Sequence, residues 1–429
     1  MLRRLHLIAL LGIALLTAAC KPDSLADEQS VRLQFSADTL SFDTVFTTMG
    51  TATQQVRVYN RSGHDVELNA VGLEQGRASR FRINVDGDTA EVARHVLIQD
   101  GDSIFIFVQA CVDPNNSTSP FLVQDAIRFS NGQRLPLTAW GRNAVYHKPS
   151  AADSSWFTPI DCAAWDHTRP HVILGNAAVL DGNTLTLTAG DELHFGPDAM
   201  LIIDSNAHLV ARGTAERPVL FTAVRHEEWY RELPGQWQMI WLYNYSTGNV
   251  IDHAVIENGT DGVRGYPHSQ LTLTNTTIRR MSDAALVGQN AAIEADNILS
   301  YDCYTSLALI GGGSYAFSRC TLANYWNYRG KTRDTATVVL SNYYPLSPTE
   351  LFFADMPQAA FSRCIVYGSR QREVSINAAE GYTLRYSFDR CLVRGGEWDE
   401  DPLFEDVPAD DYRLRDGSPA HGIGYQFED

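Results

Sequence analysis

Three cysteines near the C-terminal end of the sequence stand in one repeated six-residue phrase: Cys320 in FSRCTL, Cys364 in FSRCIV and Cys391 in FDRCLV. A cysteine in a fixed frame could be a metal ligand, half of a disulfide, a nucleophile, or a packing residue that repeats because the backbone repeats. The surrounding sequence has no CxxC pair and no histidine at ligand spacing, which argues against a zinc site. The role of these cysteines therefore depends on the period of the repeat.

Acidic residues in the same half of the chain could do acid–base or metal chemistry. A glycoside hydrolase needs two carboxylates that flank the scissile bond, and a calcium-dependent lyase needs several that converge on Ca²⁺. In the alignment of the repeat given below, Asp252 and Asp296 occupy different positions, and no acid recurs at one position on neighbouring repeats. We therefore expect no metal site and favour a non-catalytic protein. The candidate acids are Asp252, Glu257, Asp261, Asp283, Glu294, Asp296 and Asp302.

Two groups of residues are candidates for ligand binding. Arg363 and Arg390 share the third position of the repeated phrase on neighbouring repeats, where like charges repel unless an acid such as Asp389 or an anionic ligand neutralises them. The segment NYWNYRGKTRD (324–334) lies outside the phrase and contains Tyr325, Trp326 and Tyr328, which are candidates for stacking on sugar rings. The alternatives are a neutralised charge pair and ordinary loop packing.

The positions of the cysteines predict the elements that hold them. Residues aligned with these cysteines recur about every 22 residues along the chain, and we call such an aligned set a column. β-branched and aromatic residues are frequent and no helical period is present, so the repeat indicates a parallel β-solenoid. One gap of 44 residues is interpreted as two coils, which would separate Cys320 and Cys364 by roughly 9.6 Å, too far for a disulfide. We favour buried packing; a disulfide between Cys364 and Cys391 and a metal or redox role are alternatives. The column is Ala254, Thr276, Asn297, Cys320, Asn342, Cys364 and Cys391.

Several segments of this half resemble a known family. GNTLTLTAGDELHFGPDAMLIIDSNAHLVARGTAERPVLFTA (182–223) and PGQWQMIWL (234–242) resemble the opening coils of right-handed parallel β-helix proteins of the pectate-lyase-like superfamily. DPLFEDVPADDYRLRDGSPAHGIG (401–424) is similar to the closing segment of many of them. The resemblance implies a right-handed parallel β-helix over 170–400 and a C-terminal cap segment over 401–429. It implies no particular function, because unrelated functions share this fold.

The N-terminal half has a different pattern. Between residues 31 and 146, short runs such as QQVRVYN and DSIFIFVQA alternate apolar and polar residues between turn sequences such as NRSG and SNGQ. This pattern predicts a β-sandwich, and the strand order resembles the immunoglobulin-like domains of the Hydin-related kind. The segment HKPSAADSSWFTP begins a linker that we assign to 147–169. The expected fold is all-β, a sandwich followed by a solenoid.

The first residues are typical of an exported protein. Arg3 and Arg4 precede an apolar run, and the small residues Thr17-Ala18-Ala19 precede Cys20, which predicts a signal peptide over 1–19. Cysteine at this place resembles the lipobox of bacterial lipoproteins, which implies acylation of Cys20 and a lipid anchor in the outer membrane, on the cell-surface or periplasmic face. The polar segment 20–30 is predicted to be a flexible tether.

Charge and composition narrow the function. The formal net charge is −17, and it becomes −19 when residues 1–19 are removed with their two arginines. Such acidity argues against nucleic acid as a partner. We expect a cell-envelope lipoprotein that binds an extracellular polysaccharide or assembles a surface protein complex, without a cofactor. The alternative is a polysaccharide lyase or glycosidase acting on a uronic-acid-containing polysaccharide, the one case in which Ca²⁺ would be expected.

Overall fold

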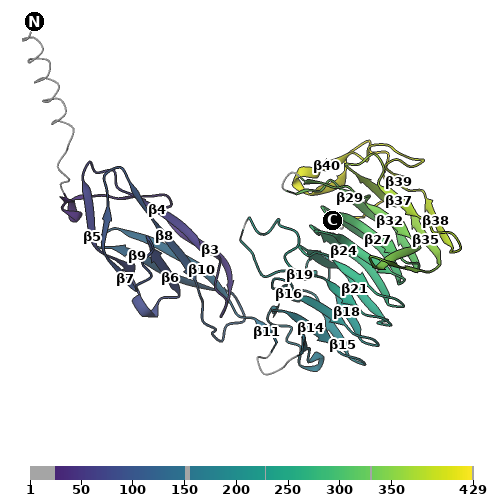
Figure 1. Ribbon diagram of the computed structural model, residues 1–429, viewed down its shortest axis with the longest axis horizontal. Coiled ribbons are helices and arrows are strands. Elements are labelled where there is room, and N and C mark those ends of the chain that lie inside the picture. Colours follow the sequence, from purple (N-terminus) through teal and green to yellow (C-terminus); the bar gives the residue numbers. More distant parts are fainter. Residues whose placement is uncertain (1–24, 150–154, 228, 329–330, 428–429) are drawn as a thin grey trace, which may run out of the picture. The chain divides into compact units, whose positions relative to one another are not determined.

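The computed structural model describes residues 25–149, 155–227, 229–328 and 331–427, and Cys20 with its signal peptide lies outside them. The described chain is built from β-strands and four short 3₁₀ helices, so the all-β prediction is confirmed (Figure 1). Its contacts divide it into two compact units, which meet in sequence between Asn143 and Ala144. Among the described residues, no helix has the length and apolar character needed to cross a membrane.

The first unit consists of two β-sheets that share one core. One sheet has the strand order β1-β5-β9-β10-β3 with β7 beside β5, and the other has the order β2-β4-β8-β6. Side chains of both sheets meet in the core, where the rings of Phe42 and Phe81 lie 5.9 Å apart. The elements are β1 (Leu25–Ala26), η1 (Glu28–Ser30), β2 (Gln34–Phe35), β3 (Leu40–Phe46), β4 (Gln54–Tyr59), β5 (Asp65–Leu73), η2 (Gly76–Ala78), β6 (Phe81–Val85), β7 (Val92–Ile98), β8 (Ser103–Ala110), β9 (Phe121–Phe129) and β10 (Arg134–Arg142).

The end of the predicted tether is attached to this unit. Strand β1 pairs with β5, which places Leu25 beside Asp65. Glu28 accepts hydrogen bonds from the backbone and side chain of Asn69, at 3.0 and 2.6 Å, and from the hydroxyl of Ser130. Residues 25–30 therefore belong to the folded unit, in contrast to the flexible tether expected over 20–30.

The second unit is a parallel β-helix, and this part of the prediction is confirmed. A 16-stranded and a 9-stranded sheet wind around a common core, and every pairing between successive coils is parallel. The long strands β24 (Gln270–Arg279) and β26 (Ala292–Tyr301) bend from one side of the 16-stranded sheet to the other. Each coil therefore has three faces. The two sides of the 16-stranded sheet are called the first and second faces, and the 9-stranded sheet is the third; along the chain each strand of the second face is followed by one of the third and then one of the first.

The strands fall into these faces as follows. The first face contains β15 (Thr184–Leu187), β18 (His208–Arg212), β21 (Asn249–Asp252), the starts of β24 and β26, β28 (Ser314–Ser318), β35 (Met356–Ser362) and β38 (Leu384–Asp389). The second contains β11 (Val145–His147), β13 (His171–Ile173), β16 (Glu192–Phe195), β19 (Val219–Ala223), β22 (Ala254–Glu257), the ends of β24 and β26, β29 (Thr321–Asn324), β36 (Ile365–Gly368) and β39 (Leu392–Val393). The third contains β12 (Phe157–Pro159), β14 (Asn176–Val179), β17 (Met200–Ile203), β20 (Ile240–Leu242), β23 (Val263–Gly265), β25 (Ala284–Gln289), β27 (Thr305–Ile310), β32 (Val338–Ser341) and β37 (Val374–Asn377).

The cysteine position of the repeated phrase forms an interior column, as predicted, and so does its phenylalanine position. The rings of Phe317 and Phe361 stack at 5.2 Å and those of Phe361 and Phe388 at 4.6 Å. The three cysteines of the phrase lie in the core with free thiols, and the backbone N–H of Cys364 donates to Sγ of Cys391 at 3.3 Å. Buried packing is therefore the role that the structure supports for these thiols.

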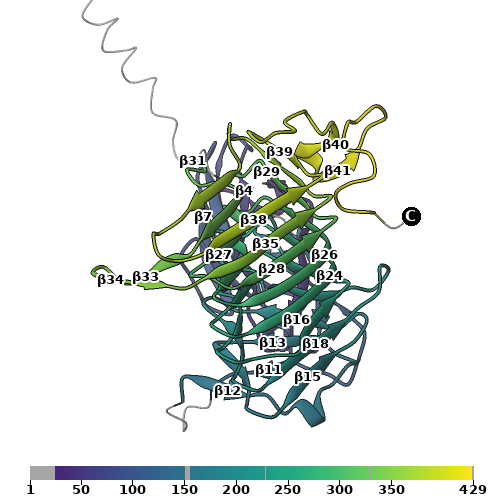
Figure 2. The same ribbon diagram turned by 90° about the vertical axis from the view of Figure 1, so that its right-hand side faces the viewer.

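The gap of 44 residues is one coil and not two, which corrects the predicted spacing. Strand β28 pairs directly with β35, so Cys320 and Cys364 lie on adjacent coils. The additional residues form two hairpins, β30 (Asn327–Tyr328) with β31 (Lys331–Thr332) and β33 (Tyr343–Ser347) with β34 (Glu350–Phe353), and Figure 2 shows the second one projecting from the coils. Asn342 follows β32 on the third face and is not in the column.

The predicted column is also shifted by one residue in an earlier coil. Ile298, rather than Asn297, lies between Thr276 and the coil that contains Cys320. Asn297 occupies the preceding corner, where its φ of 58° matches the φ of 51° at Arg319. A left-handed residue at this corner of successive coils lets the strand turn from the first face to the second.

Both ends of the β-helix differ from the boundaries assigned from the sequence. Strands β11 and β12 pair with β13 and β14, so the coils begin before and within the segment 147–169 that was assigned to a linker. The C-terminal segment (401–427), with β40 (Phe404–Asp406), η4 (Val407–Ala409) and β41 (Asp411–Leu414), packs against the outer side of the second face. The backbone N–H of Gly424 donates to the carbonyl of Arg363 at 2.8 Å, so this segment runs back along the coils.

Candidate functional site

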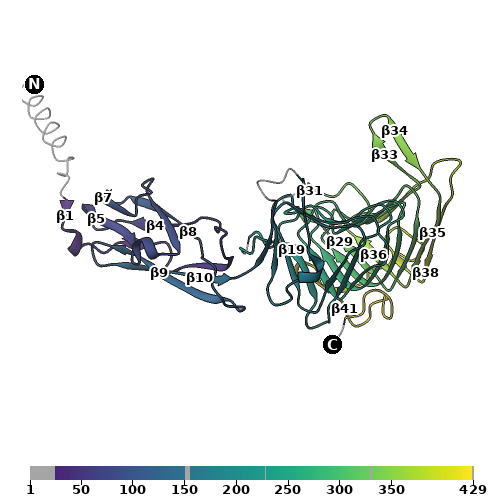
Figure 3. The same cartoon turned by 90° about the horizontal axis from the view of Figure 1, so that it is seen from below.

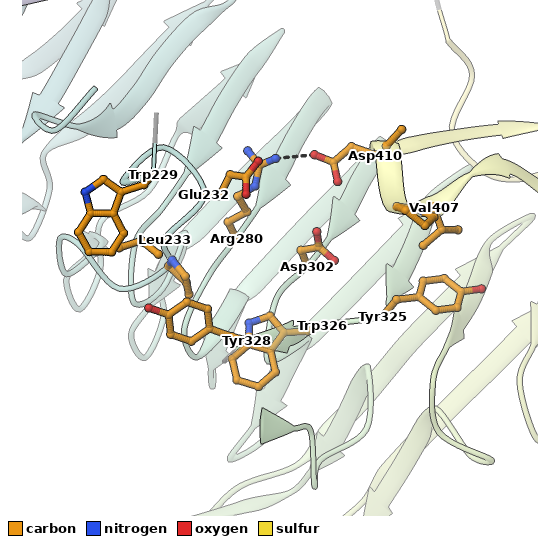
Figure 4. Close-up of a pocket in the computed structure, with 13 residues that line it drawn as sticks. Trp229, Glu232, Leu233, Arg280, Asp302, Tyr325, Trp326, Tyr328, Val407 and Asp410 are labelled. Atoms are coloured by element: carbon orange, nitrogen blue, oxygen red, sulfur yellow. Dashed lines mark hydrogen bonds and ion pairs between the residues drawn. The ribbon is translucent and has the colours of Figure 1, made fainter. Parts of the chain in front are cut away.

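A cavity of about 710 Å³ opens at the corner where the chain passes from the second face to the third (Figure 4). Four parts of the chain form it: the loop between β19 and β20, the corner residues of β24 and β26, the loop after β29, and the C-terminal segment. Aromatic side chains lie at its rim and charged side chains at its floor. The lining residues are Trp229, Glu232, Leu233, Pro234, Arg280, Asp302, Tyr325, Trp326, Tyr328, Val407, Pro408, Ala409 and Asp410.

The β19–β20 loop presents Trp229, whose side chain is 60% exposed. The amide of Asn258, a left-handed corner residue, donates to the carbonyls of Arg231 and Leu233 at 2.8 and 2.9 Å and fixes the returning half of the loop. The guanidinium of Arg225 lies 3.8 Å from the ring centre of Tyr230. A cation over an aromatic face is attractive, so this contact holds the outgoing half.

The loop after β29 presents Trp326 and Tyr328, whose ring centres are 6.2 Å apart. Tyr304, at the corner of the preceding coil, meets Trp326 edge-on at 5.3 Å. The loop returns to the coils at Arg333, whose guanidinium is fully buried and lies 2.6 Å from the carboxylate of Glu373. A buried charge pair with this geometry gives the loop a fixed end.

The floor of the cavity consists of two corner residues on adjacent coils, Arg280 and Asp302, with φ of 56° and 50°. A left-handed backbone costs a non-glycine residue roughly 1 kcal/mol or more and directs the side chain away from the strand direction. Arg280 is ion-paired with Asp410 of the C-terminal segment at 2.5 Å, and Figure 4 shows Asp302 between this pair and Trp326.

Burial raises the pKa of Asp302 to about 6, and the negative charge of Asp410 adds to the shift, while Arg280 opposes it. Asp302 and Asp410 therefore form a carboxyl pair in which Asp302 keeps its proton to a higher pH than an isolated carboxyl does. Beneath the floor, Arg279 is paired with Glu257 at 2.7 Å and donates to the hydroxyl of Tyr301 at 2.7 Å. The guanidinium of Arg279 therefore bonds to Glu257 and Tyr301 and not to the carboxyl pair.

The substitution Asp302→Asn is expected to stabilise the protein above pH 6. The folded carboxyl keeps its proton up to about pH 6, whereas the unfolded one loses it near its ordinary value of about 4, so stability falls as the pH rises between these values. The variant removes this loss, so its free energy of unfolding above pH 6 should be higher by at most about 3 kcal/mol. The gain is smaller to the extent that solvent screens the partly exposed side chain. Denaturant unfolding from pH 4 to 8 measures it. The exposed Asp416→Asn is the control, and destabilisation by Asp302→Asn at pH 7 would contradict the expectation.

The ligand-binding residues expected from the sequence lie at two different corners. Tyr325, Trp326 and Tyr328 line the cavity, although Tyr325 packs against the core under the C-terminal segment and Figure 4 shows its ring directed away from Trp326. Arg363 and Arg390 lie at the corner between the first and second faces, exposed, and do not line the cavity.

These two arginines have different surroundings. Arg390 is 3.4 Å from Asp389, and both side chains are exposed, so the predicted neutralising acid is present. The guanidinium of Arg363 has no hydrogen bond or ion pair with the residues that the structure describes. Its charge nevertheless lowers the pKa of Asp296, after the larger effect of the hydrogen bond from Arg319.

The candidate acids are dispersed, and Asp302 is the member of the list that lines the cavity. Asp252 and Asp296 do share one column of the first face, with Thr274 between them, which corrects the different positions given above. Asp261 pairs with Arg264 at 2.6 Å. In the described part of the chain, no three His, Cys, Asp or Glu side chains gather as ligands for a metal ion.

The sequence did not identify Glu232 and Asp410 as part of a site. Asp410 follows VPA in the C-terminal segment, 130 residues after its partner Arg280, and the repeat period does not extend to it. The sequence feature that could have indicated the site is the presence of aromatic residues at 229–230 and at 325–328, each in a long segment between two strands.

Comparison with known proteins gives matches among solved structures alone. No family description matches the chain, and no curated protein matches it. Among solved structures, one match is to "The details of glycolipid glycan hydrolysis by the structural analysis of a family 123 glycoside hydrolase from Clostridium perfringens", at 8% identity and a TM-score of 0.18. The match covers 25% of each chain, and at this TM-score it carries no argument about fold or function.

Proposed function

We propose that the protein binds a glycan in the cavity at the corner between the second and third faces. The observation that carries this proposal is the combination of Trp229, Trp326 and Tyr328 at the rim with Arg280 and the carboxyl pair at the floor. The apolar face of a pyranose packs on an aromatic ring, and its hydroxyl groups bond to carboxylates and guanidinium groups. The volume of about 710 Å³ is within the range of roughly 300–1,000 Å³ that is typical of small-ligand sites.

The substitution Trp326→Ala is expected to weaken binding of an oligosaccharide by about 5- to 30-fold, which corresponds to roughly 1–2 kcal/mol of lost ring contact. The loss should not change with salt, because stacking involves no net charge. Isothermal titration with neutral and uronic-acid oligosaccharides measures it. Trp140→Ala removes an exposed tryptophan, 48% exposed, from the first unit and is the control. Equal binding by the parent and by Trp326→Ala for each glycan that the parent binds would exclude this cavity.

Glycoside hydrolysis is a second candidate function, because Asp302 retains its proton up to about pH 6 and lies beside a second carboxyl group, that of Asp410. In such a reaction Asp302 would donate its proton to the leaving glycosidic oxygen, and a second carboxylate would activate water. An assay for reducing ends and for unsaturated products separates hydrolase, lyase and binding protein. Loss of turnover in Asp302→Asn with retained binding would assign the acid.

We further propose that the protein is a lipoprotein of the outer membrane, anchored through Cys20 and working on an extracellular polysaccharide or in a surface protein complex. The support is the basic, apolar and small-residue pattern of residues 1–19. Lipid labelling of the parent and of Cys20→Ser tests the anchor. The exposed Arg363 and Arg390 would add contacts to an anionic glycan at the corner between the first and second faces. Replacing them with alanine should then weaken binding, and the loss should depend on salt concentration.

A further inference from the structure

The core of the β-helix is open at its C-terminal end. On the first face, Tyr315 and Ala359 are each 1% exposed, whereas Tyr386, the next member of their column, is 50% exposed. On the third face, Leu340 is fully buried and its neighbour Ile376 on the last coil is 36% exposed. Side chains of the interior columns thus become accessible to solvent at the last coil, so the hydrophobic core is not covered at this end.

The strands of the last coil also have open edges. β38 and β37 end the first and third faces, and no strand among the described residues pairs with their outer edges (Figures 1 and 3). The second face is closed, because the backbone N–H of Val393 donates to the carbonyl of Trp398 at 2.8 Å. At the opposite end, Cys162 of η3 (Cys162–Ala164) and Trp165 pack over the core. Open strand edges normally acquire a cover, since unpaired N–H and C=O groups accept further strands.

We propose that this end binds a second copy of the chain, with β38 pairing antiparallel to β38 of that copy across a two-fold axis at Ser387. A single strand from another protein would satisfy one of the two open edges. A second β-helix end offers the open edge of its own β38 together with an equally open core. The two-fold axis makes the contact self-complementary, which is the usual form of a homodimer interface.

The sequence of β38, LRYSFD, is complementary to itself in this register. With Ser387 on the axis, Arg385 is directly opposite Asp389 of the second copy, and Tyr386 is opposite Phe388 of the second copy. Residues opposite one another share a face of the sheet, so the ion pairs lie on the outer face and the aromatic pairs on the core side. Each pair occurs twice. This local complementarity opposes the repulsion between two acidic chains.

Charge reversal tests the register. Light scattering of the full chain in mild detergent should give a dimer at micromolar concentration. Arg385→Asp and Asp389→Arg should each raise the dissociation constant about tenfold or more, because each places like charges opposite one another twice. The double variant Arg385→Asp/Asp389→Arg should restore the dimer. A monomeric parent, or a dimer that neither single variant weakens, overturns the proposal.

A cross-link tests the axis independently. Ser387→Cys should oxidise to a covalent dimer, because residues that face one another in antiparallel strands have Cα atoms about 4.5–5.5 Å apart, within disulfide range. Ser314→Cys, on β28 of the same face and exposed, is the matched control and should stay monomeric under the same oxidation. Absence of the Ser387→Cys dimer in a folded protein, or equal cross-linking of the control, contradicts the two-fold contact.

Discussion

Replacing Glu373 with alanine is expected to lower the free energy of unfolding of the β-helix by about 3–5 kcal/mol, because it leaves the guanidinium of Arg333 buried without its counter-charge. Both side chains are fully buried, and one carboxylate oxygen lies 2.6 Å from Nη2 of Arg333. The other oxygen accepts from the backbone N–H and the hydroxyl of Thr337, at 3.0 and 2.8 Å. The same change removes the fixed end of the loop that presents Trp326, so glycan binding should fall as well.

Denaturant unfolding followed by tryptophan fluorescence measures this loss, since seven of the eight tryptophans belong to the second unit and Trp140 alone to the first. The control is Glu91→Ala, which breaks the exposed ion pair with Arg77 and should cost at most about 1 kcal/mol. The double variant Arg333→Met/Glu373→Met should recover most of the stability, because no unpaired charge remains. If the alanine variant costs no more than the control, the pair is not the anchor of the loop.

The architecture could be predicted because a coil imposes its period on the sequence. Phe317, Phe361 and Phe388 occupy one interior column, and an interior column admits similar side chains on every coil. The corner residues are less constrained: Asn275, Asn297 and Arg319 all have left-handed backbone, and asparagine and arginine look unrelated in a sequence. This explains why Asn297 was aligned with the cysteines instead of with Arg319.

The length of a coil is a weaker signal than its period. A hairpin inserted between faces leaves the strand register unchanged, so the segment from Cys320 to Cys364 could be interpreted as two coils. Strand β32 even supplies a plausible intermediate repeat around Asn342. What distinguishes one long coil from two short ones is the pairing of β28 with β35, a contact that depends on the fold of the whole segment.

The candidate site could be predicted only in part, for a related reason. Tyr325, Trp326 and Tyr328 could be recognised because aromatic residues are conspicuous in a polar segment. Asp302 was one acid among seven, and its raised pKa depends on burial and on Asp410, which reaches it through the C-terminal segment. The site is formed where loops of different coils meet a segment outside the repeat, so no local pattern describes it.

Replacing Cys364 with arginine is expected to prevent stable folding of the β-helix, whereas Cys364→Ala should cost about 1–2 kcal/mol. Cys364 is fully buried between Cys320 and Cys391, where hydrogen bonding with Cys320 and burial raise the pKa of its thiol, so a charge at this position would be isolated in the core. Alanine removes only a small polarizable group.

Thermal and denaturant unfolding of the two variants measure this difference, with the exposed Ser369→Arg as the control for the added charge. Thiol labelling of the native parent provides an independent measurement. The partly exposed Cys111 and Cys162 should react, and Cys320 and Cys364, which each lie between two paired coils, should react only after unfolding. Rapid labelling of the interior thiols in the native protein, or a Cys364→Arg protein as stable as Ser369→Arg, would contradict the arrangement of the column, because a residue between two stacked coils has no route to water while both coils remain paired.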